Sequence, residues 1–458
     1  MKNTSTKVLL IIFLLLITYY GCRVDNKRAF HDDVNNRSKV ELTDNQLLDS
    51  IQYQTFNYFW DGAEPNSGMA RERLHMDDVY PTSPKNTVTT GGTGFGLMAI
   101  IVGVERGFIT STEALLRFEK IVGFLEKADR FHGVWPHWLV GETGKVTAFS
   151  EKDNGGDLVE TAFLIQGLLT VKEYYLEGNN REKKLSSRIQ KLWEEVEWNW
   201  YTKGGEDVLY WHWSPNYEWD MNFPVGGYNE ALIMYVLAAA SPTYSIPKRV
   251  YEKGWALNNK IKKDTIYYGL KTVLNHYEHD NSPVGPLFWA HYSYLGLNPN
   301  GLKDQYANYW ELNKNHALIH YKHSLENPNN FEGYGENLWG LTSSYSMNGY
   351  SGHRPDRDLS VISPTAAISS IPYTPKESLQ FIRYIYTQQD SMIGKYGPYD
   401  AFSLEKKWYV SRYLAIDQGP IPVMIENYRT KLLWNLFMKN EDLQNGLKKL
   451  GFTSPYIK

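Results

Sequence analysis

Residues 155–169 read GGDLVETAFLIQGLL, a pair of glycines followed by a mostly apolar run that opens with Asp157 and Glu160. The apolar positions do not form a single stripe, which is typical of a helix buried on all sides. The same order, a Gly-rich or Pro-rich loop and then an apolar segment, recurs elsewhere in the chain. Six candidate inner helices therefore begin near residues 91, 155, 226, 285, 363 and 418.

More charged, amphipathic segments alternate with these runs and begin near residues 43, 111, 182, 247, 302 and 375. Helix-capping residues support their boundaries: Thr43, Ser111 and Thr112 suit N-caps, and Pro247 and Pro375 suit a first helical turn. We predict an all-α fold, an (α/α)6 barrel of six inner and six outer alternating helices. An open helical solenoid is the alternative, but it should show a steadier repeat length.

This topology suggests why so much negative charge precedes one inner helix. All inner helices would run in the same direction, so the loops that lead into them would converge at one end of the barrel. Capping explains Asp157 alone, because a helix N-terminus attracts one negative charge, but it does not explain Asp153 and Glu160 as well. The same mouth is expected to receive further carboxylates, namely Glu230, Glu332, Glu336, Asp400 and Asp417.

The composition is that of an ordinary globular protein with an excess of aromatic residues. The 458 residues carry a net charge of only −3, without the basic excess that nucleic-acid binding needs. Aromatic residues reach 15%, and many lie in polar stretches such as VWPHWLV and YWHWSPNYEWDMNF. Flat faces with polar edges suit sugar rings, although a large helical protein also fills its core with Tyr and Trp.

Paired carboxylates among aromatics are the groups that glycoside hydrolysis requires, one as a proton donor and another to activate water or attack the sugar. The catalytic candidates are Glu230, Asp153, Asp157 and Glu160. The candidates for substrate binding are Trp135, Trp138, Trp211, Trp213, Tyr228, Glu336, Trp339, Arg354 and Asp400.

Other chemistries lack their motifs, since the chain has no GxSxG, no P-loop and no HExxH. In HALIHYKH, histidines have helical metal-ligand spacing, but we interpret them as solvated or interhelical polar surface of an outer helix. We expect no metal and no cofactor. The segment GYSGHRPDRD brings His353, Arg354 and Arg357 together. They could serve a phosphorylase as a phosphate site, but we expect them to pair with carboxylates or to hold sugar hydroxyls.

The N-terminus predicts export. Lys2 and Lys7 precede the apolar run VLLIIFLLLI, and Cys22, the only cysteine, follows directly behind it. We predict a lipoprotein signal peptide at 1–21, a lipid anchor on Cys22, a flexible tether at 22–42 and a single catalytic domain at 43–458. The protein would then be a monomeric lipoprotein in the periplasm or outer membrane of a Gram-negative bacterium, attached to the membrane through its anchor.

Four segments, DNGGDLVETAFLIQGLL, PVGGYNEAL, YGENLWGLTSS and DQGPIPVMIENYRTKLLW, resemble the bacterial glucoamylase-like proteins that include glycoside hydrolase family 144. The resemblance implies an (α/α)6 barrel that acts on β-1,2-linked glucan, either endo or exo with release of sophorose, and that requires no metal. It also implies that Glu230 is the general acid and that Asp153, Asp157 and Glu160 are important for activity. The general base stays open.

We therefore expect a glycoside hydrolase that cleaves β-1,2-glucan or its oligosaccharides, with inversion. Three alternatives remain: a non-catalytic glycan-binding lipoprotein of a sugar-uptake system, a glucoamylase-like hydrolase of another glucoside, and a phosphorolytic enzyme. Fold resemblance by itself does not decide among them.

Overall fold

The structure, a computed structural model, describes residues 42–81, 83–276 and 284–458. The predicted signal peptide, Cys22 and all but the last residue of the predicted tether lie outside this range. Residues Ile51–Lys458 form one compact unit. Across the described ranges, no helix is both long and apolar enough to cross a bilayer.

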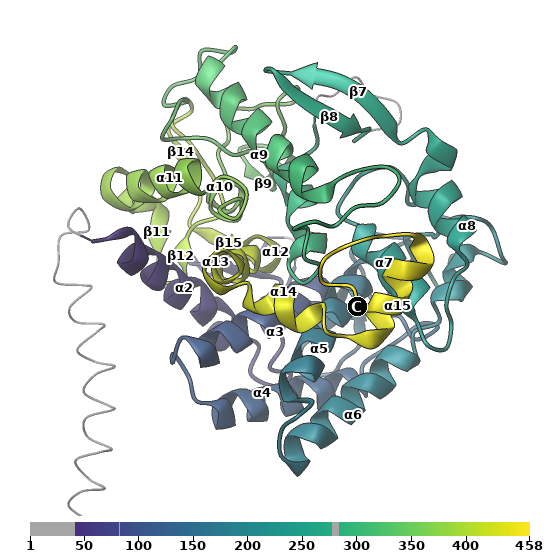
Figure 1. The fold of residues 1–458 in the computed structure, drawn as a ribbon. Helices are drawn as coiled ribbons and strands as arrows, with labels where there is room; N and C mark the ends of the chain where they lie inside the picture. Colours follow the sequence, from purple (N-terminus) through teal and green to yellow (C-terminus); the bar gives the residue numbers. More distant parts are fainter. Residues whose placement is uncertain (1–41, 82, 277–283) are drawn as a thin grey trace, which may run out of the picture. The chain divides into compact units, whose positions relative to one another are not determined.

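The protein is mostly helical (Figure 1). The helices are α2 (Asp44–Trp60), α3 (Thr90–Glu105), α4 (Ser111–Leu125), α5 (Leu158–Tyr175), α6 (Asn180–Glu194), α7 (Leu232–Ala240), α8 (Lys248–Val250), α9 (Tyr309–Glu326), α10 (Pro364–Ile368), α11 (Pro375–Gln388), α12 (Ala415–Gln418), α13 (Pro420–Thr430), α14 (Leu432–Phe437) and α15 (Glu441–Leu450).

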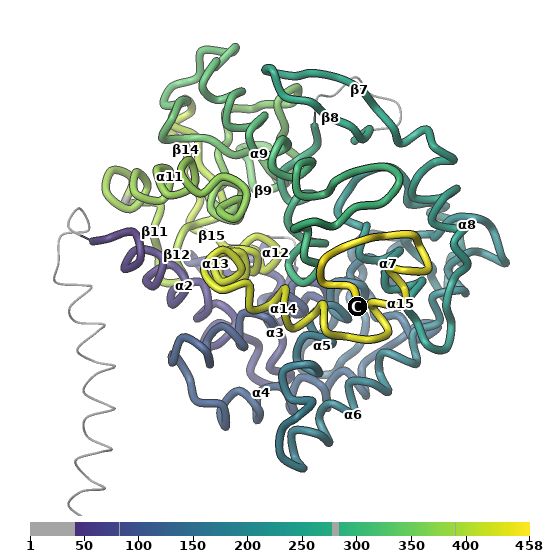
Figure 2. The backbone as a smooth tube through the Cα atoms, in the orientation of Figure 1, coloured from purple at the N-terminus to yellow at the C-terminus, as the bar shows by residue number. Residues whose placement is uncertain are grey.

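Helices α3 and α5 are buried on all sides, as the sequence predicts for inner helices. Every residue from 90 to 103 and from 158 to 171 is buried. The two helices lie side by side (Figure 2) and touch through glycines. A Cβ on Gly94 would lie 2.1 Å from the carbonyl oxygen of Phe163, and one on Gly167 would lie 2.2 Å from that of Gly94. Only glycine permits such a close approach of the two backbones.

Helices α4 and α6 are one-sided, which is the pattern expected of outer helices. The buried residues of α4 recur every three or four positions, from Ala114 to Leu125. Its N-cap is Thr110, which forms a capping box with Glu113, so the predicted caps at Ser111 and Thr112 are displaced by one or two residues. Pro375 does stand in the first turn of α11, as predicted.

The later helix pairs are shorter than predicted. The segment from residue 247 holds the three-residue α8, one π-helical turn and a 3-10 turn at Leu257–Asn259. The segment from residue 285 holds two 3-10 turns, Leu287–Ala290 and Tyr292–Tyr294. Helix α10 stops at Ile368 because Pro372 follows and disfavours helical geometry in the residue before it. The segment from residue 302 becomes helical only at Tyr309.

Short antiparallel ribbons, which the sequence analysis did not predict, line the ends of the helices. Strand β1 pairs with β15, β2 with β3, β3 with β4, and β5 with β6. The strands are β1 (Arg73–His75), β2 (Thr87–Thr89), β3 (Trp138–Val140), β4 (Val146–Thr147), β5 (Gly156–Asp157), β6 (His212–Trp213), β7 (Lys262–Tyr267), β8 (Leu270–Leu274), β9 (Ser343–Ser346), β10 (Gly349–Gly352), β11 (Ile393–Gly394), β12 (Gly397–Pro398), β13 (Phe402–Ser403), β14 (Trp408–Tyr409) and β15 (Arg412–Leu414).

The C-terminal helices pack against earlier parts of Ile51–Lys458. In Figure 1 the yellow helix α15 lies beside α7, and α14 contacts α5. An ion pair of 2.7 Å between Arg106 at the end of α3 and the buried Glu426 joins α3 to α13. The indole Nε1 of Trp434 donates a hydrogen bond of 2.7 Å to the carbonyl oxygen of Tyr294.

Candidate active site

A cleft of about 1080 Å³ opens where the loops that precede the buried helices come together. Thr89 contributes from just ahead of α3, Glu230 from ahead of α7 and Ile416 from ahead of α13, while Glu160 reaches in from the first turn of α5. Segments that lead into α3, α5, α7 and α13 therefore line one cleft, although the predicted Glu332, Glu336, Asp400 and Asp417 are not among its described lining residues. The other lining residues include Arg73, His137, Trp138, Phe149, Trp211, Tyr292, Tyr345, Tyr350, Trp408 and Arg412.

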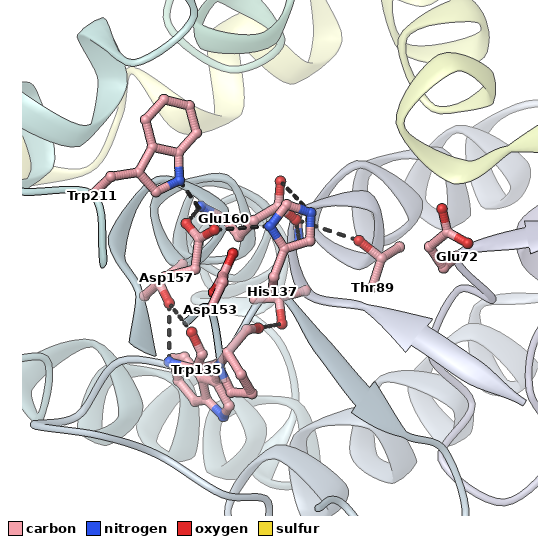
Figure 3. Close-up of polar contacts among 12 residues, drawn as sticks. Glu72, Thr89, Trp135, His137, Asp153, Asp157, Glu160 and Trp211 are labelled. Atoms are coloured by element: carbon pink, nitrogen blue, oxygen red, sulfur yellow. Dashed lines mark hydrogen bonds and ion pairs between the residues drawn. The ribbon is translucent and has the colours of Figure 1, made fainter. Parts of the chain in front are cut away.

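Asp157 is a helix cap and a hydrogen-bond acceptor at once. Its Oδ1 accepts from the backbone N–H of Glu160 at 2.9 Å, which caps α5. Its Oδ2 accepts from the indole Nε1 of Trp211 at 3.0 Å and from Nδ1 of His137 at 2.9 Å. Figure 3 shows these donors converging on the carboxylate. The pairing of β5 with β6 places the Trp211 loop beside Asp157.

Asp153 lies in the loop before α5, as predicted, and faces a second histidine. His212 Nδ1 is 3.3 Å from Oδ1 of Asp153 and 3.8 Å from Oδ2 of Asp157. Asp153 is 3% exposed. Two buried carboxylates thus share one imidazole on this side of α5.

Glu160 is held by the start of the neighbouring helix. Its Oε2 accepts from the backbone N–H of Gly91 at 2.7 Å and from the hydroxyl of Thr89 at 3.3 Å. Its Oε1 lies 4.0 Å from Nε2 of His137. The N-terminus of α3 is a favourable place for a carboxylate, because its backbone N–H groups have no partner within the helix.

The charges of this group depend on one another. Burial lowers the pKa of His137, but the charges of Glu160 and Asp157 outweigh it and raise that pKa to about 9. Burial raises the pKa of Asp157, yet the hydrogen bond from His137 and the positive charges of His212 and His137 bring it below its usual value. Burial and the charge of Asp157 raise the pKa of Glu160, although His137 opposes them. At neutral pH, His137 is therefore a cation beside an ionised Asp157.

Glu230 has the environment of a proton donor. It is 8% exposed and lines the cleft just ahead of α7. Burial, helped by the negative charges of Glu160 and Asp157, raises its pKa to about 7. A carboxyl group with a pKa near neutrality can be protonated at the pH of reaction and still give up its proton.

Asp400 and Asp417 form a separate pair of buried carboxyls. The backbone N–H of Tyr345 donates to Oδ2 of Asp400 at 2.7 Å. Burial raises the pKa of Asp400 to about 6, while burial and the charge of Asp400 raise that of Asp417 well above its usual range. Neither is among the described residues that line the cleft, but the neighbouring Tyr292 and Tyr345 are.

Only two of the aromatic residues predicted to bind sugar lie in the cleft wall. Trp138 and Trp211 line the cleft. Trp213 packs edge-on against His132. Three others, Trp135, Tyr228 and Trp339, belong to the core instead, because they have no exposed surface. Their polar atoms donate hydrogen bonds within the protein: Trp135 to the carbonyl oxygen of Leu125, Tyr228 to Oδ1 of Asn313, and Trp339 to the carbonyl oxygen of Glu377. These three serve packing rather than the cleft.

Two predicted polar residues also lie elsewhere. Glu336 is exposed and accepts a hydrogen bond of 3.3 Å from Gln380 Nε2. Arg354 forms an ion pair of 2.8 Å with Asp356. Neither belongs to the cleft wall as far as the described residues define it.

The histidines of HALIHYKH lie on α9, and of the two interpretations, solvated or interhelical polar surface, the solvated one is wrong. His316, His320 and His323 are all buried, and the Nε2 atoms of His316 and His320 lie 2.7 and 2.9 Å from the carbonyl oxygen of Gly285. Burial lowers the pKa of both rings, so they stay neutral in the interior.

One group in the described residues has metal-ligand geometry: ligand atoms of His137, Asp153 and Asp157 lie within 4.8 Å of one another. With its pKa near 9, His137 is a donor to Asp157 at neutral pH. A protonated imidazole offers no lone pair to a metal, which favours an ion pair over a metal centre.

Several cleft residues were not predicted from the sequence, among them the three basic residues His137, Arg73 and Arg412. His137 stands inside the segment VWPHWLV, in which the predicted site residues are the two tryptophans. Arg73 and Arg412 lie on the paired strands β1 and β15 and reach the cleft from opposite ends of the chain. No local pattern signals this pairing.

Comparisons with known proteins place the chain among its relatives. The Glycoamylase family model, described as "Putative glucoamylase", matches residues 222–441. An endo-β-1,2-glucanase from Chitinophaga pinensis, solved in complex with sophorotriose and glucose, is 59% identical; the match covers 91% of this chain and 100% of that one, with a TM-score of 0.89.

A second relative is the exo β-1,2-glucooligosaccharide sophorohydrolase (non-reducing end) of Parabacteroides distasonis, 45% identical over 426 residues and 89% of this chain. The present chain spans 58% of that relative's length. An endo-β-1,2-glucanase from Talaromyces funiculosus shares the fold alone, at 10% identity with a TM-score of 0.64, over 88% of this chain and 90% of that one. The full-length match to the Chitinophaga enzyme identifies the chain as a member of the bacterial glucoamylase-like proteins that include glycoside hydrolase family 144.

Proposed function

We propose that this protein is a glycoside hydrolase that cleaves β-1,2-linked glucan or its oligosaccharides. The observation that carries the proposal is the carboxyl group of Glu230, whose pKa is raised to about 7, in the same cleft as the carboxylate of Glu160. Related proteins named as β-1,2-glucan hydrolases support the linkage. Trp138, Trp211 and the two tyrosines Tyr345 and Tyr350 supply faces on which sugar rings stack.

In this proposal Glu230 is the general acid, which protonates the oxygen of the departing sugar. Asp153, Asp157 and Glu160 form the opposing group, which orients the water and the sugar hydroxyls. Within it, Asp157 is fully engaged by Trp211, His137 and the helix terminus. The water-activating role therefore falls more naturally to a freer carboxylate, Glu160 or Asp153. We propose inversion, for which acid and base stand about 6.5–9.5 Å apart with room for a water.

The test is an incubation with β-1,2-glucan and with defined sophoro-oligosaccharides, followed by chromatography of the products and proton NMR of the first anomer formed. We expect new reducing ends and an α-anomer as the initial product. Binding without product would instead identify a glycan-binding protein. Product formation that depends on added phosphate would identify a phosphorylase, which the engagement of Arg354 by Asp356 disfavours.

We also propose that the helices form an (α/α)6 barrel within a single catalytic domain. The alternation of fully buried helices α3, α5 and α7 with one-sided helices α4, α6 and α11 supports this arrangement. The active site would occupy the mouth formed by the loops that lead into the inner helices. The crowding of carboxylates there follows from the same topology.

We further propose that the protein is exported as a monomeric lipoprotein, anchored through Cys22 in the periplasm or outer membrane of a Gram-negative bacterium. The support is the sequence alone: Lys2 and Lys7, the apolar run and the single cysteine behind it. A Cys22→Ala protein should move from the membrane fraction to the soluble fraction and keep its specific activity. If it stays with the membrane, the anchor is not Cys22.

A further inference from the structure

A second cavity, of about 840 Å³, lies in the described structure apart from the carboxylate cleft. Its wall comes from the 3-10 turn Trp198–Thr202, the loop that follows it, Trp219, and residues 244–250. It shares no lining residue with the cleft. Its volume falls within the range that small-molecule sites occupy.

Two aromatic rings of the cavity wall, those of Trp200 and Trp219, are held in place by contacts with other rings. Trp200 is 40% exposed, and one face of its indole is stacked on His132 with the ring centres 3.7 Å apart and the planes at 13°. Trp219 lies 6.5 Å from Trp200 at 32°, and Tyr244 is 38% exposed. Rings that need not be immobilised on binding lose little conformational entropy, which favours stacking of a ligand on them.

The charged groups around the cavity have hydrogen-bond or ion-pair partners within the protein. Glu197 lies 3.0 Å from Nδ1 of His132, and Arg249 is paired with Asp207 at 2.7 Å. Lys203 donates to Asn222 at 2.7 Å, and Glu206 accepts from the hydroxyl of Tyr210 at 2.6 Å. Because each of these charged groups already has a partner, the cavity is not expected to bind an ion in preference to a neutral ligand.

Polar groups nevertheless remain at the edges of the rings. The side-chain amide of Asn199 is exposed and has no hydrogen-bond partner among the described residues. Gly204 and Gly205, with φ of 85° and 100°, are exposed. The N–H of Gly205 donates to the hydroxyl of Thr202 at 3.1 Å, so the carbonyl groups of this turn are the acceptors offered to a ligand. Aromatic faces edged with amide and peptide donors and acceptors suit a neutral, hydroxyl-rich ligand.

A two-residue ribbon connects this cavity to the active site. In β6, His212 pairs with Asp157 and lies near its carboxylate, whereas the next residue, Trp213, pairs with Gly156. Because successive strand residues point to opposite faces, Trp213 turns away from the carboxylates. It packs edge-on against Trp200, with ring centres 6.3 Å apart. The two sites thus back onto the same ribbon.

We propose that this cavity is a secondary carbohydrate-binding site that holds a neutral gluco-oligosaccharide stretch of the polymeric substrate outside the catalytic cleft. Trp200 and Tyr244 are the stacking residues, and Asn199 and the Gly204–Gly205 peptides bind hydroxyls. A second contact with one chain raises its effective concentration at the first site. The identity of the sugar rests on the proposed function; the existence of a separate binding site does not.

The first experiment compares polymer with short substrate. In Tyr244→Ala and Trp200→Ala proteins, we expect KM for polymeric β-1,2-glucan to rise by about threefold to tenfold, the loss of one stacking contact, while kcat/KM for sophorotetraose stays unchanged. The Tyr244 ring is the safer deletion, because only the backbone atoms of Tyr244 make hydrogen bonds within the described residues. The matched control is Tyr428→Ala, which removes a tyrosine that is 39% exposed on α13 and lines neither cavity.

The second experiment counts sites directly. Isothermal titration of the Glu230→Gln protein with sophoro-oligosaccharides should give two sites per chain, and adding Tyr244→Ala and Trp200→Ala should leave one. One site in both proteins, or an unchanged KM for polymer, overturns the inference while the proposed function stands. No binding and no hydrolysis by any variant, the parent included, refutes the proposed function instead. A parent protein that sediments as a dimer and a Trp200→Ala protein that sediments as a monomer would show that the wall is a subunit interface.

Discussion

Nδ1 of His137 lies 2.9 Å from Oδ2 of Asp157, a carboxylate with no exposed surface. The ring also faces Glu160 across 4.0 Å. A buried carboxylate is stable only when it is paired and hydrogen-bonded. His137 therefore balances the negative charge of the acidic group and fixes the orientation of Asp157. Its ring also lines the cleft.

His137→Asn should keep a hydrogen-bond donor toward Asp157 but remove the positive charge, whereas His137→Ala removes both. We expect kcat/KM to fall by about tenfold in the first and by about a hundredfold in the second, on the scale of a hydrogen bond to a charged group. The low-pH limb of the rate profile should move to higher pH, because the pKa of Asp157 rises without its cation. Equal losses in the two proteins, with unmoved limbs, would contradict a charge-holding role.

Activity should decline as the pH rises through about 7, because Glu230 must be protonated to act as the acid and burial raises its pKa to about 7. Glu230→Gln keeps the shape of the side chain but has no proton to transfer, so we expect turnover to drop by about a hundredfold to ten-thousandfold while substrate still binds. Steady-state rates across pH measure both effects. A Glu230→Gln enzyme with near-normal turnover would remove Glu230 from the acid role.

The same carboxyl group should cost stability above neutral pH. Its folded-state pKa of about 7 exceeds the ordinary value of 4.5, so the neutral form is favoured in the fold and stability is lost as the pH rises between these values. Glu230→Gln should therefore match the parent below about pH 4.5 and exceed it by roughly 1–3 kcal/mol above about pH 8. Urea unfolding of both proteins at both pH values measures the difference in the free energy of unfolding. If Glu230→Gln is more stable than the parent only at acidic pH, the prediction is wrong.

Gly94→Ala should destabilise the protein and weaken catalysis, because its Cβ would lie 2.1 Å from the Phe163 carbonyl oxygen where α3 meets α5. We expect a loss of about 1–3 kcal/mol or more in the free energy of unfolding, as for other overpacked cores. The displaced α3 would also disturb the hydrogen bond from Gly91 to Glu160.

Gly123→Ala on the outer helix α4 is the control for that substitution. Its Cβ would meet only the flexible end of Arg188, at 3.3 Å. Replacing a helical glycine by alanine there should be neutral or stabilise by about 0.5–1 kcal/mol. If Gly94→Ala behaves like Gly123→Ala, the close packing of α3 on α5 is not required.

The long helices could be identified from the sequence alone, because a helix that is buried on all sides has apolar residues on every face. The runs that became α3, α5 and α7 are apolar on every face, and the one-sided spacing of α4 and α6 is equally local. The sequence also placed Asp157 and Glu160 at the start of α5 and indicated that loops distant in sequence meet at one mouth. These features need only periodicity and a repeated order of segments.

Tertiary structure decided everything that depends on which segments face each other. Trp135 and Trp138 share one short motif, yet the first is wholly buried and the second lines the cleft. His137, between them, acquires its raised pKa only from carboxylates on another element, and Glu230 acquires its own from burial beside them. Electrostatic energies depend on distance and burial, and both are set by long-range packing rather than by neighbours in the chain.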